Sequence, residues 1–265
     1  MQSDDWSWID EDDDWVPPTV DLTRPSIARV YDYGLGGKDN YPVDRELADK
    51  FRAIAPDVTE AARANRRFLV EVVTSMAQAG IQQFIDLGTG LPTSPSVHES
   101  AWAVQPGTKI VYVDNDPIVL AHNRALMRAD ERVAVLSHDL RQPASVLADP
   151  AVRGLLDFSR PIGLLMIAVM HFVEVASGPA IVGRYVRDLP SGSQLAISSL
   201  SSHGIASEVL RRTESLYGAS TGTLLAYRNE AEIDALFDRL KMIQPLKEVY
   251  RSQTLAVLGG VGLKP

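Results

Sequence analysis

The sequence predicts an α/β protein in which a doubly wound, mostly parallel sheet follows an N-terminal helical segment. From residue 81 onward, short apolar runs alternate with stretches of helical periodicity, and a glycine-rich turn follows the first run. Two further apolar runs lie near the C-terminus. Alternating strand and helix patterns are typical of βαβ units, whose strands pair in parallel. Five alternating runs and a closing pair predict seven strands, the last two forming a hairpin.

Each expected strand is a short apolar run, and each of the first five is followed by a helical stretch. We expect parallel strands at residues 83–87, 109–113, 133–136, 162–168 and 194–199, and closing strands at 242–249 and 254–258. The helices expected between them are 96–104, 117–129, 144–156, 179–189, 205–217 and 230–240, the last capped by Asn229.

The segment before the sheet is typical of helices. We expect helices at 27–33, 43–55 and 58–79, the last beginning after a cap at Asp57 and ending at Gly80. Because they precede every strand, we expect them to pack over the sheet as a lid or buttress. The predicted organisation is therefore an acidic disordered tail over residues 1–18, a helical lid over 19–80 and a ligand-binding domain over 81–265.

The composition excludes several classes of site. With no cysteine, the chain has no disulfides, thiol nucleophiles or zinc-thiolate sites. The four histidines other than His171 do not have the spacing of metal ligands, so we expect no metal. The longest apolar stretch, residues 162–173, is shorter than the ~20 residues of a membrane-spanning helix. With no secretory signal pattern at the N-terminus, these features favour a cytoplasmic protein that does not bind a membrane.

The charge is unevenly distributed along the chain. The net charge is −8, but residues 1–21 contain eight acids and no Lys or Arg, and the remainder balances at 26 acids and 26 bases. This balance argues against a general nucleic-acid binder, which needs a basic face to displace counterions. The tail also contains Trp6, Trp8 and Trp15. We interpret it as a solvated segment, with docking on a partner as the alternative.

A glycine turn follows the first expected strand, where ligands bind in open α/β sheets. Gly88, Thr89 and Gly90 allow the backbone to turn tightly and to approach a ligand without Cβ obstruction. By itself this turn is a weak signal. A nicotinamide-binding fingerprint would have a third glycine where Thr93 stands, and Pro92 would disturb a phosphate-binding helix start.

Acidic residues follow the second and third expected strands, at the same edge of the sheet. Asp114 and Asp116 follow the second strand and Asp139 follows the third. Asp114, 24 residues after Gly90, is placed to accept ribose hydroxyls, with helix capping as the alternative and Asp116 as the better cap. Asp139 could accept an adenine amino group. These acids would repel the 2′-phosphate of NADP and favour a ligand that is cationic at sulfur, such as S-adenosylmethionine.

Several longer segments carry a specific resemblance. They are FIDLGTGLPT at 84–93, His98-Glu99, VYVDNDPIVLAH at 111–122, ARVYDYGLGGKDNY at 28–41 and ANRRFL at 64–69. The chain resembles an actinobacterial family of S-adenosylmethionine-dependent methyltransferases with unassigned substrates, from about Pro25 to its end. The resemblance implies a class I, Rossmann-like methyltransferase fold and S-adenosylmethionine as the cofactor.

The resemblance also implies a cofactor site made from several segments. Glycines and neighbours of the first turn would hold the methionine and ribose part, the acid after the second strand the ribose hydroxyls, and the residues after the third strand the adenine edge. Four N-terminal residues would close over the cofactor, or else belong to a plain interhelical turn. The implied set is Tyr31, Tyr33, Gly34, Asn40, Gly88, Thr89, Gly90, Pro92, Asp114, Asn115, Asp116, Asp139, Leu140 and Ala168.

Methyl transfer is a direct displacement, so the protein has to align the acceptor and exclude water. A general base helps only an acceptor that must lose a proton. The candidate base is His171, just beyond the fourth strand, and the alternative is a structural histidine bonded to backbone. We expect an unidentified small-molecule acceptor. Two other functions stay open: a non-catalytic S-adenosylmethionine-binding or sensing protein, and an NAD-dependent oxidoreductase.

Overall fold

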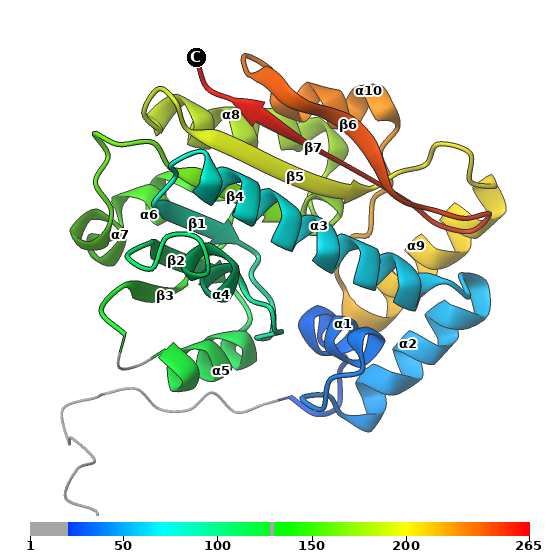
Figure 1. Ribbon diagram of the computed structural model, residues 1–265. Helices are drawn as coiled ribbons and strands as arrows, with labels where there is room; N and C mark the ends of the chain where they lie inside the picture. The colour runs from blue at the N-terminus through cyan, green and yellow to red at the C-terminus, as the bar shows by residue number, and fades with distance from the viewer. Residues whose placement is uncertain (1–20, 128–129) are drawn as a thin grey trace, which may run out of the picture.

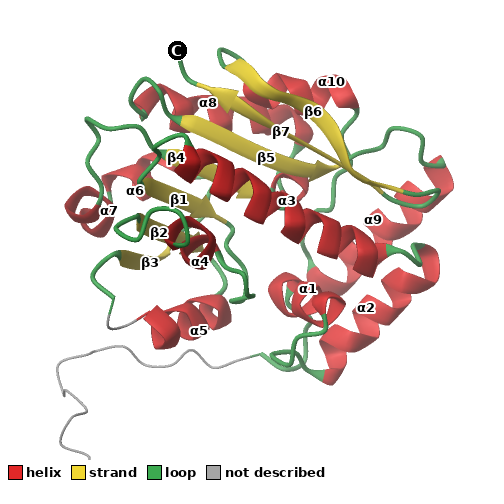
Figure 2. Ribbon diagram, viewed as in Figure 1, coloured by secondary structure: helices red, strands yellow, loops and turns green. Residues whose placement is uncertain are grey.

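One seven-stranded sheet forms the centre of the computed structural model, which describes residues 21–127 and 130–265 (Figures 1 and 2). The acidic tail expected for residues 1–18 lies outside the described residues. The strand order is β3-β2-β1-β4-β5-β7-β6. The strands are β1 Gln83–Leu87, β2 Lys109–Asp114, β3 Val133–Ser137, β4 Gly163–Ile167, β5 Gln194–Leu200, β6 Lys241–Arg251 and β7 Ala256–Leu263.

The pairing confirms the predicted doubly wound, mostly parallel sheet. Strands β1 to β5 pair in parallel. Strand β7 is antiparallel to both of its neighbours, β5 and β6, and β7 and β6 close one side of the sheet. From β1 the chain adds β2 and β3 on one side and then returns to place β4 on the other. Phe84 of β1 is thus paired with Ile110 of β2 and with Gly163 of β4. This reversal of strand order opens a crevice at the carboxyl ends of β1 and β4.

Helices cover both faces of the sheet, so the central strands are buried on both sides. Phe84 packs with α3 and α4, while Ile85 packs on the opposite face with α6, α7 and α8. Successive residues of a strand point to opposite faces, which explains the continuously apolar strands. The helices on and around the sheet are α3 Val58–Gln78, α4 Val97–Trp102, α5 Pro117–Met127, α6 Pro143–Ala148, α7 Pro150–Leu155, α8 Gly178–Asp188, α9 Ser207–Thr221 and α10 Glu230–Asp234, with 3₁₀ turns η1 Met170–Phe172, η2 Val175–Ser177 and η3 Ala235–Phe237.

The N-terminal helices divide into two parts. Helix α3 runs across one face of the sheet, whereas α1 Ile27–Leu35 and α2 Pro42–Ile54 lie beyond the carboxyl ends of the strands, with α2 packed against α9 (Figure 1). A buried ion pair joins α1 to α2: the Arg29 guanidinium lies 2.7 Å from the Asp44 carboxylate, and the two side chains are 1% and 0% exposed. Helices α1 and α2 thus lie over the crevice as a joined pair.

Local chemistry explains where the elements differ from the expected ones. The helix expected over 144–156 is two helices, because Pro150 lacks an amide hydrogen and the Asp149 carboxylate caps the second helix through the Ala151 amide. Asp57 does not cap α3 through its side chain; its carboxylate accepts a hydrogen bond from the Thr254 hydroxyl at 3.3 Å. The predicted cap at Asn229 is confirmed.

Strand β7 extends five residues beyond its expected end, through a glycine-rich stretch that sequence patterns disfavour in strands. A Cβ at Gly259 would lie 2.8 Å from the Phe68 ring of α3, and one at Gly262 would lie 2.9 Å from Leu240. The glycines are therefore needed for the close approach of side chains on both faces. No helix within residues 21–127 or 130–265 combines the length and apolar character of a membrane span.

Candidate functional site

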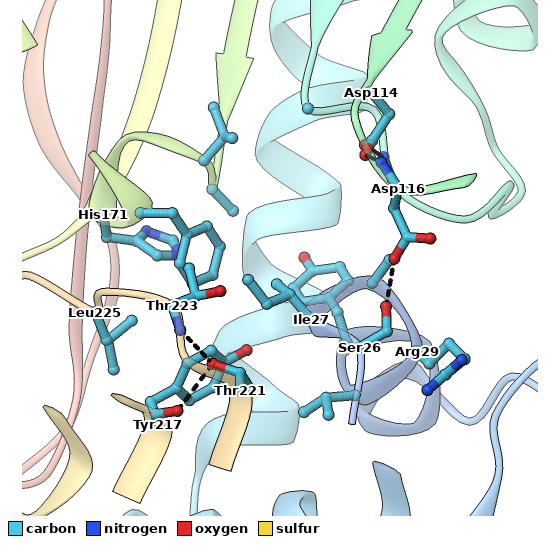
Figure 3. Close-up of a pocket in the computed structure, with 18 of the residues that line it drawn as sticks. Ser26, Ile27, Arg29, Asp114, Asp116, His171, Tyr217, Thr221, Thr223 and Leu225 are labelled. Carbon is cyan, nitrogen blue, oxygen red and sulfur yellow. Dashed lines mark hydrogen bonds between the residues drawn. The ribbon is translucent and has the colours of Figure 1, made fainter. Parts of the chain in front are cut away.

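A cavity of about 1130 Å³ lies at the carboxyl ends of β1, β2 and β4, beneath α1 and α2 (Figure 3). This volume exceeds the ~300–1,000 Å³ of a typical small-molecule pocket. Its wall comes from segments far apart in sequence: the N-terminal helices, the turns after β1 to β4, and the α9 region. The cavity can therefore hold more than one small molecule.

The glycine turn after β1 forms part of the wall. Gly88 and Gly90 have φ values of 73° and 67°, in the left-handed region that side chains disfavour. A Cβ at Gly88 would collide with Val169, and a Cβ at Gly90 would enter open space. The first glycine is thus required by packing against the turn after β4, and the second leaves its backbone open to the cavity.

The acids after β2 line the same cavity and make different contacts. The Asp114 carboxylate accepts hydrogen bonds from the amides of Gly90 and Asp116, both at 2.9 Å. Burial raises its pKa. Asp116 caps α5, as predicted, by accepting from the Ile118 amide at 2.8 Å, and its other oxygen accepts from the Ser26 hydroxyl at 2.6 Å. Asp114 thereby joins two turns, and Asp116 joins the sheet edge to α1.

Asp139, after β3, also lines the cavity, so the expected convergence of the three acids is present. Its carboxylate is engaged by the Arg141 guanidinium, with the nearest atoms 2.6 Å apart, and these hydrogen bonds lower the pKa of Asp139. The neighbouring Leu140 carbonyl accepts from the Tyr185 hydroxyl at 3.0 Å. Asp139 is therefore less free than Asp114 to bind a ligand.

Two further polar residues line the cavity that sequence reasoning did not select. Asp86 lies inside β1, and burial raises its pKa to about 6. Arg66 of α3 donates to the Thr93 carbonyl at 2.8 Å and also to the Pro95 carbonyl. An acid inside an apolar strand two residues before the glycine turn was the signal for Asp86, and Arg66 lies in a segment that carried the resemblance.

The expected N-terminal contacts are only partly brought to the cavity. Tyr31 and Gly34 line it, being three residues apart on one face of α1. Tyr33 lies on another face, where its ring faces the Arg52 guanidinium. Asn40 is turned to the Asp32 carboxylate at 2.8 Å. Pro92 also lies outside the wall, which includes Leu91 and Thr93.

Three expected residues without charge, Asn115, Leu140 and Ala168, line the cavity. Ala168 has a φ of 55°, which ends β4 one residue before the predicted end. The Ala168 amide donates to the carbonyl oxygen of Ser198 on β5 at 3.1 Å and to the Ser198 hydroxyl oxygen at 3.0 Å. This left-handed residue turns the chain into η1.

His171, in η1, lines the cavity and is buried. Its Nδ1 faces the Leu200 amide at 3.5 Å, and its ring lies 4.4 Å from that of Phe172. Burial, with the positive charge of Arg228, lowers its pKa to about 3. The imidazole is therefore neutral at pH 7 and a weak base.

The end of the cavity near α9 is apolar and aromatic, and the sequence did not indicate it. Its wall includes Phe51 of α2, Phe172 of η1, Tyr217 of α9, and Leu225 and Leu255 beyond. Helical apolar periodicity is the same for residues that line a cavity and for those that fill a core. No sequence signal could have separated them. Across the described part of the chain, no cluster of three or more His, Cys, Asp or Glu is suited to a metal ion.

The strand order, the crevice beside β1 and the acid at the end of β2 define a class I methyltransferase of the Rossmann-like type. A family model described as S-adenosyl methyltransferase matches residues 13–249. The chain therefore belongs to this family of S-adenosylmethionine-dependent methyltransferases, whose cofactor is S-adenosylmethionine. No curated protein matches the sequence.

Solved structures agree with this assignment. A candidate methyltransferase from Thermobifida fusca YX is 37% identical, with a TM-score of 0.87, over 94% of this chain and 98% of that one. A DUF574 family protein from Streptomyces avermitilis MA-4680 is 37% identical with the same TM-score, 0.87, over 93% and 100%. An O-methyltransferase family protein from Burkholderia thailandensis, at 15% identity and a TM-score of 0.50 over 80% and 61%, shares the fold alone. The family excludes the expected alternative of an oxidoreductase.

Proposed function

We propose that the chain transfers the methyl group of S-adenosylmethionine to a small molecule, with the cofactor at the polar end of the cavity and the acceptor at the apolar end. The observation that carries this proposal is the convergence of a glycine turn and three acids at the ends of β2 and β3 on one cavity that continues to an aromatic wall. The volume leaves room for both molecules.

The residues at the polar end fit the cofactor. The Asp114 carboxylate accepts hydrogen bonds from two backbone amides, which leaves lone pairs for the ribose hydroxyls. The open space at Gly90 permits the cofactor to approach the backbone closely. We assign Gly88, Thr89 and Gly90 to the methionine and ribose part, and Asn115, Asp139 and Leu140 to the adenine. The bound cofactor supplies an electrophilic methyl group on a sulfonium, whose positive charge the neighbouring carboxylates favour.

The N-terminal part acts as a lid in this proposal. Tyr31 and Gly34 of α1 would face the cofactor, and the Ser26–Asp116 hydrogen bond would hold α1 over the end of β2. Tyr33, Asn40 and Pro92 have no direct role, because none of them lines the cavity. We assign α1 and α2 to the lid and α3 to the covering of the sheet.

The low pKa of His171 limits its proposed role as a general base. A base whose conjugate acid has a pKa of about 3 removes a proton poorly from a hydroxyl acceptor. Alignment and exclusion of water are the main contributions of this site. His171 and Ala168 would then shape the boundary between cofactor and acceptor.

The proposed setting is a cytoplasmic protein whose acceptor is not a nucleic acid. The formal charge balance outside residues 1–21 supports this, as does the absence of cysteine. The actinobacterial distribution expected for the family is supported by relatives from Thermobifida and Streptomyces.

Calorimetry with S-adenosylmethionine, S-adenosylhomocysteine and NAD tests the cofactor site. We expect S-adenosylmethionine and S-adenosylhomocysteine to bind, and we expect no binding of NAD. The Asp114→Ala variant should lose about 2 kcal/mol of binding free energy, because a charge-assisted double acceptor is removed. Asp130→Ala is the control: it removes the same charge at a residue outside the cavity, paired with Arg132.

Unchanged affinity in Asp114→Ala would refute the ribose assignment. A chain that binds both sulfur ligands but transfers no methyl group to any member of an acceptor panel would instead favour the sensing alternative.

A further inference from the structure

The apolar end of the cavity, which we call the acceptor chamber, is formed by Phe51, Phe172, Tyr217, Leu225 and Leu255. Its identification with the acceptor site rests on the proposed function. Figure 3 shows Tyr217 and Leu225, with His171, across the cavity from Asp114 and Asp116. The two ends thus differ in chemistry: carboxylates surround one, and aromatic and aliphatic side chains the other.

The aromatic side chains of the chamber have a defined arrangement around Tyr217. The Phe172 ring is nearly parallel to it, with centroids 5.8 Å apart and an interplanar angle of 26°, and the Phe51 ring is nearly perpendicular, at 6.1 Å and 85°. Ring pairs favour both arrangements. Walls of this kind offer both a ring face and a ring edge to a flat molecule.

The Tyr217 hydroxyl is an unpartnered polar group in the wall of the chamber. Tyr217 is buried and lines the cavity, and its hydroxyl has no hydrogen-bond partner among the residues that the structure describes. The neighbouring Thr221 hydroxyl is partnered, because it donates to the Tyr217 carbonyl at 2.8 Å and accepts from the Thr223 amide at 3.0 Å. A ligand that offers one hydrogen-bonding group can therefore satisfy Tyr217.

Charged side chains are few around the acceptor chamber. Among cavity-lining residues of β4, β5, β7, α9 and their connections in the described chain, the only charged side chain is Glu174, which is exposed. From the N-terminal side, Arg24 is exposed and Arg52 is partly exposed and paired with Asp49 at 2.8 Å. An ionised group in the chamber would lose hydration without an opposite charge beside it, which is unfavourable.

We propose that the methyl acceptor is an uncharged, flat aromatic molecule with one hydrogen-bonding group, held between Phe51, Phe172 and Leu225 and bonded to the Tyr217 hydroxyl. Burial of the ring supplies the affinity, and Tyr217 supplies the orientation.

Equilibrium dialysis of the full-length chain, saturated with S-adenosylhomocysteine at pH 7, tests this proposal with three probes of equal ring size. We expect 2-naphthol to bind at least tenfold more tightly than 2-naphthoate. The Tyr217→Phe variant should weaken 2-naphthol binding by about threefold to tenfold, as for one neutral hydrogen bond, and should leave naphthalene binding unchanged.

Tyr227→Phe is the matched control. Tyr227 belongs to the same apolar cluster, but its hydroxyl is bonded to Thr213 at 2.9 Å and lies away from the cavity wall. We expect this variant to bind all three probes as the wild type does. Equal or tighter binding of 2-naphthoate, or an equal effect of Tyr217→Phe on 2-naphthol and naphthalene, would overturn the proposal.

The two proposals fail differently in this experiment. If S-adenosylhomocysteine binds and neither 2-naphthol nor naphthalene does, the acceptor proposal alone is overturned. If S-adenosylhomocysteine does not bind, the cofactor site is wrong and the acceptor proposal falls with it.

Discussion

Asp86 and Asp114 place two carboxylates in one buried end of the cavity, and their environment sets their ionisation. Burial is the main cause that raises the pKa of Asp86 to about 6; the negative charge of Asp114 adds to it, and Thr89 and Arg66 oppose it. A raised carboxyl pKa means that the folded chain holds the proton more tightly than the unfolded chain. The folded state is thus favoured at low pH.

The stability contributed by the protonated form of Asp86 is fully present below its ordinary pKa of 3.8 and is lost as the pH rises through about 6. We expect Asp86→Asn to remove this loss. Relative to the variant, the wild type should lose about 3 kcal/mol of unfolding free energy between pH 3.5 and pH 7. Urea denaturation over this pH range measures it, and parallel profiles for the two proteins would contradict it.

The sequence indicated cavity-lining acids at the ends of strands and missed the one inside a strand. Asp114 is the last residue of β2 and Asp116 follows it closely, and the end of a strand is visible in the sequence. Asp86 lies inside β1, among residues buried on both sides, and its effect depends on the depth of burial. Tyr33 of α1 does not line the cavity, because the direction in which a short helix faces depends on its packing.

At the scale of elements, α1 and α2 are joined through one carboxylate. Asp44 accepts hydrogen bonds from the Ser26 and Tyr41 amides, both at 2.9 Å, and forms the ion pair with Arg29. It therefore caps the start of both helices. The lid depends on this buried group more than on any surface contact.

Arg29→Met should destabilise the chain by about 3–5 kcal/mol, because it leaves a buried charge without its partner. Arg52→Met is the matched control: Arg52 pairs with Asp49 in solvent, where such pairs contribute about 0–1 kcal/mol. Denaturant unfolding of both variants measures the difference. Equal effects would show that the Arg29–Asp44 pair does not hold the lid.

The turn after β4 is held by a buried cation from the segment between α9 and α10. Arg228 donates to the Val173 carbonyl at 2.7 Å, to the Glu174 carbonyl at 3.2 Å and also to the Met170 carbonyl. These bonds surround η1, which carries His171 and Phe172. Arg228 is therefore a positioning residue for one wall of the acceptor chamber.

Arg228→Lys should loosen this turn, because a lysine ammonium cannot span the carbonyls that the planar guanidinium reaches. We expect a loss of about 2 kcal/mol or more in stability and faster hydrogen exchange at the Phe172 and Val173 amides. S-adenosylhomocysteine affinity should stay within about threefold, because the glycine turn is unchanged. Arg187→Lys, at an exposed pair with Asp188, is the control. Unaltered exchange in Arg228→Lys would refute the positioning role.

Element-level prediction was close because strand and helix periodicity is local. Strand β1 matches its expected range, and β2, β3 and β5 differ by one residue at the C-terminal end. The failures have physical causes that act over longer distances. Pro150 divides one expected helix, and the glycines of β7 form a strand because helix side chains need their space.

At the scale of the whole molecule, the cavity joins the lid, the sheet edge and α9, so a ligand that fills it should stabilise the whole fold. At 100 times its Kd, S-adenosylhomocysteine should add about 2.7 kcal/mol of stability. For a chain of this size we expect Tm to rise by roughly 5–10 °C. Thermal unfolding monitored by circular dichroism measures this shift. A rise of the same size with NAD would contradict the cofactor assignment.

The sequence by itself determined the order of strands and helices, the glycine turn and the acids at the strand ends, because these depend on local backbone preferences and on side-chain periodicity. Tertiary structure decided which residues of α1 face the cavity, how deeply Asp86 is buried, and that Phe51, Tyr217 and Leu255 enclose one chamber. Those properties depend on contacts between segments distant in the chain, more than 100 residues apart for Phe51 and Tyr217, and the packing that produces them has no local signature.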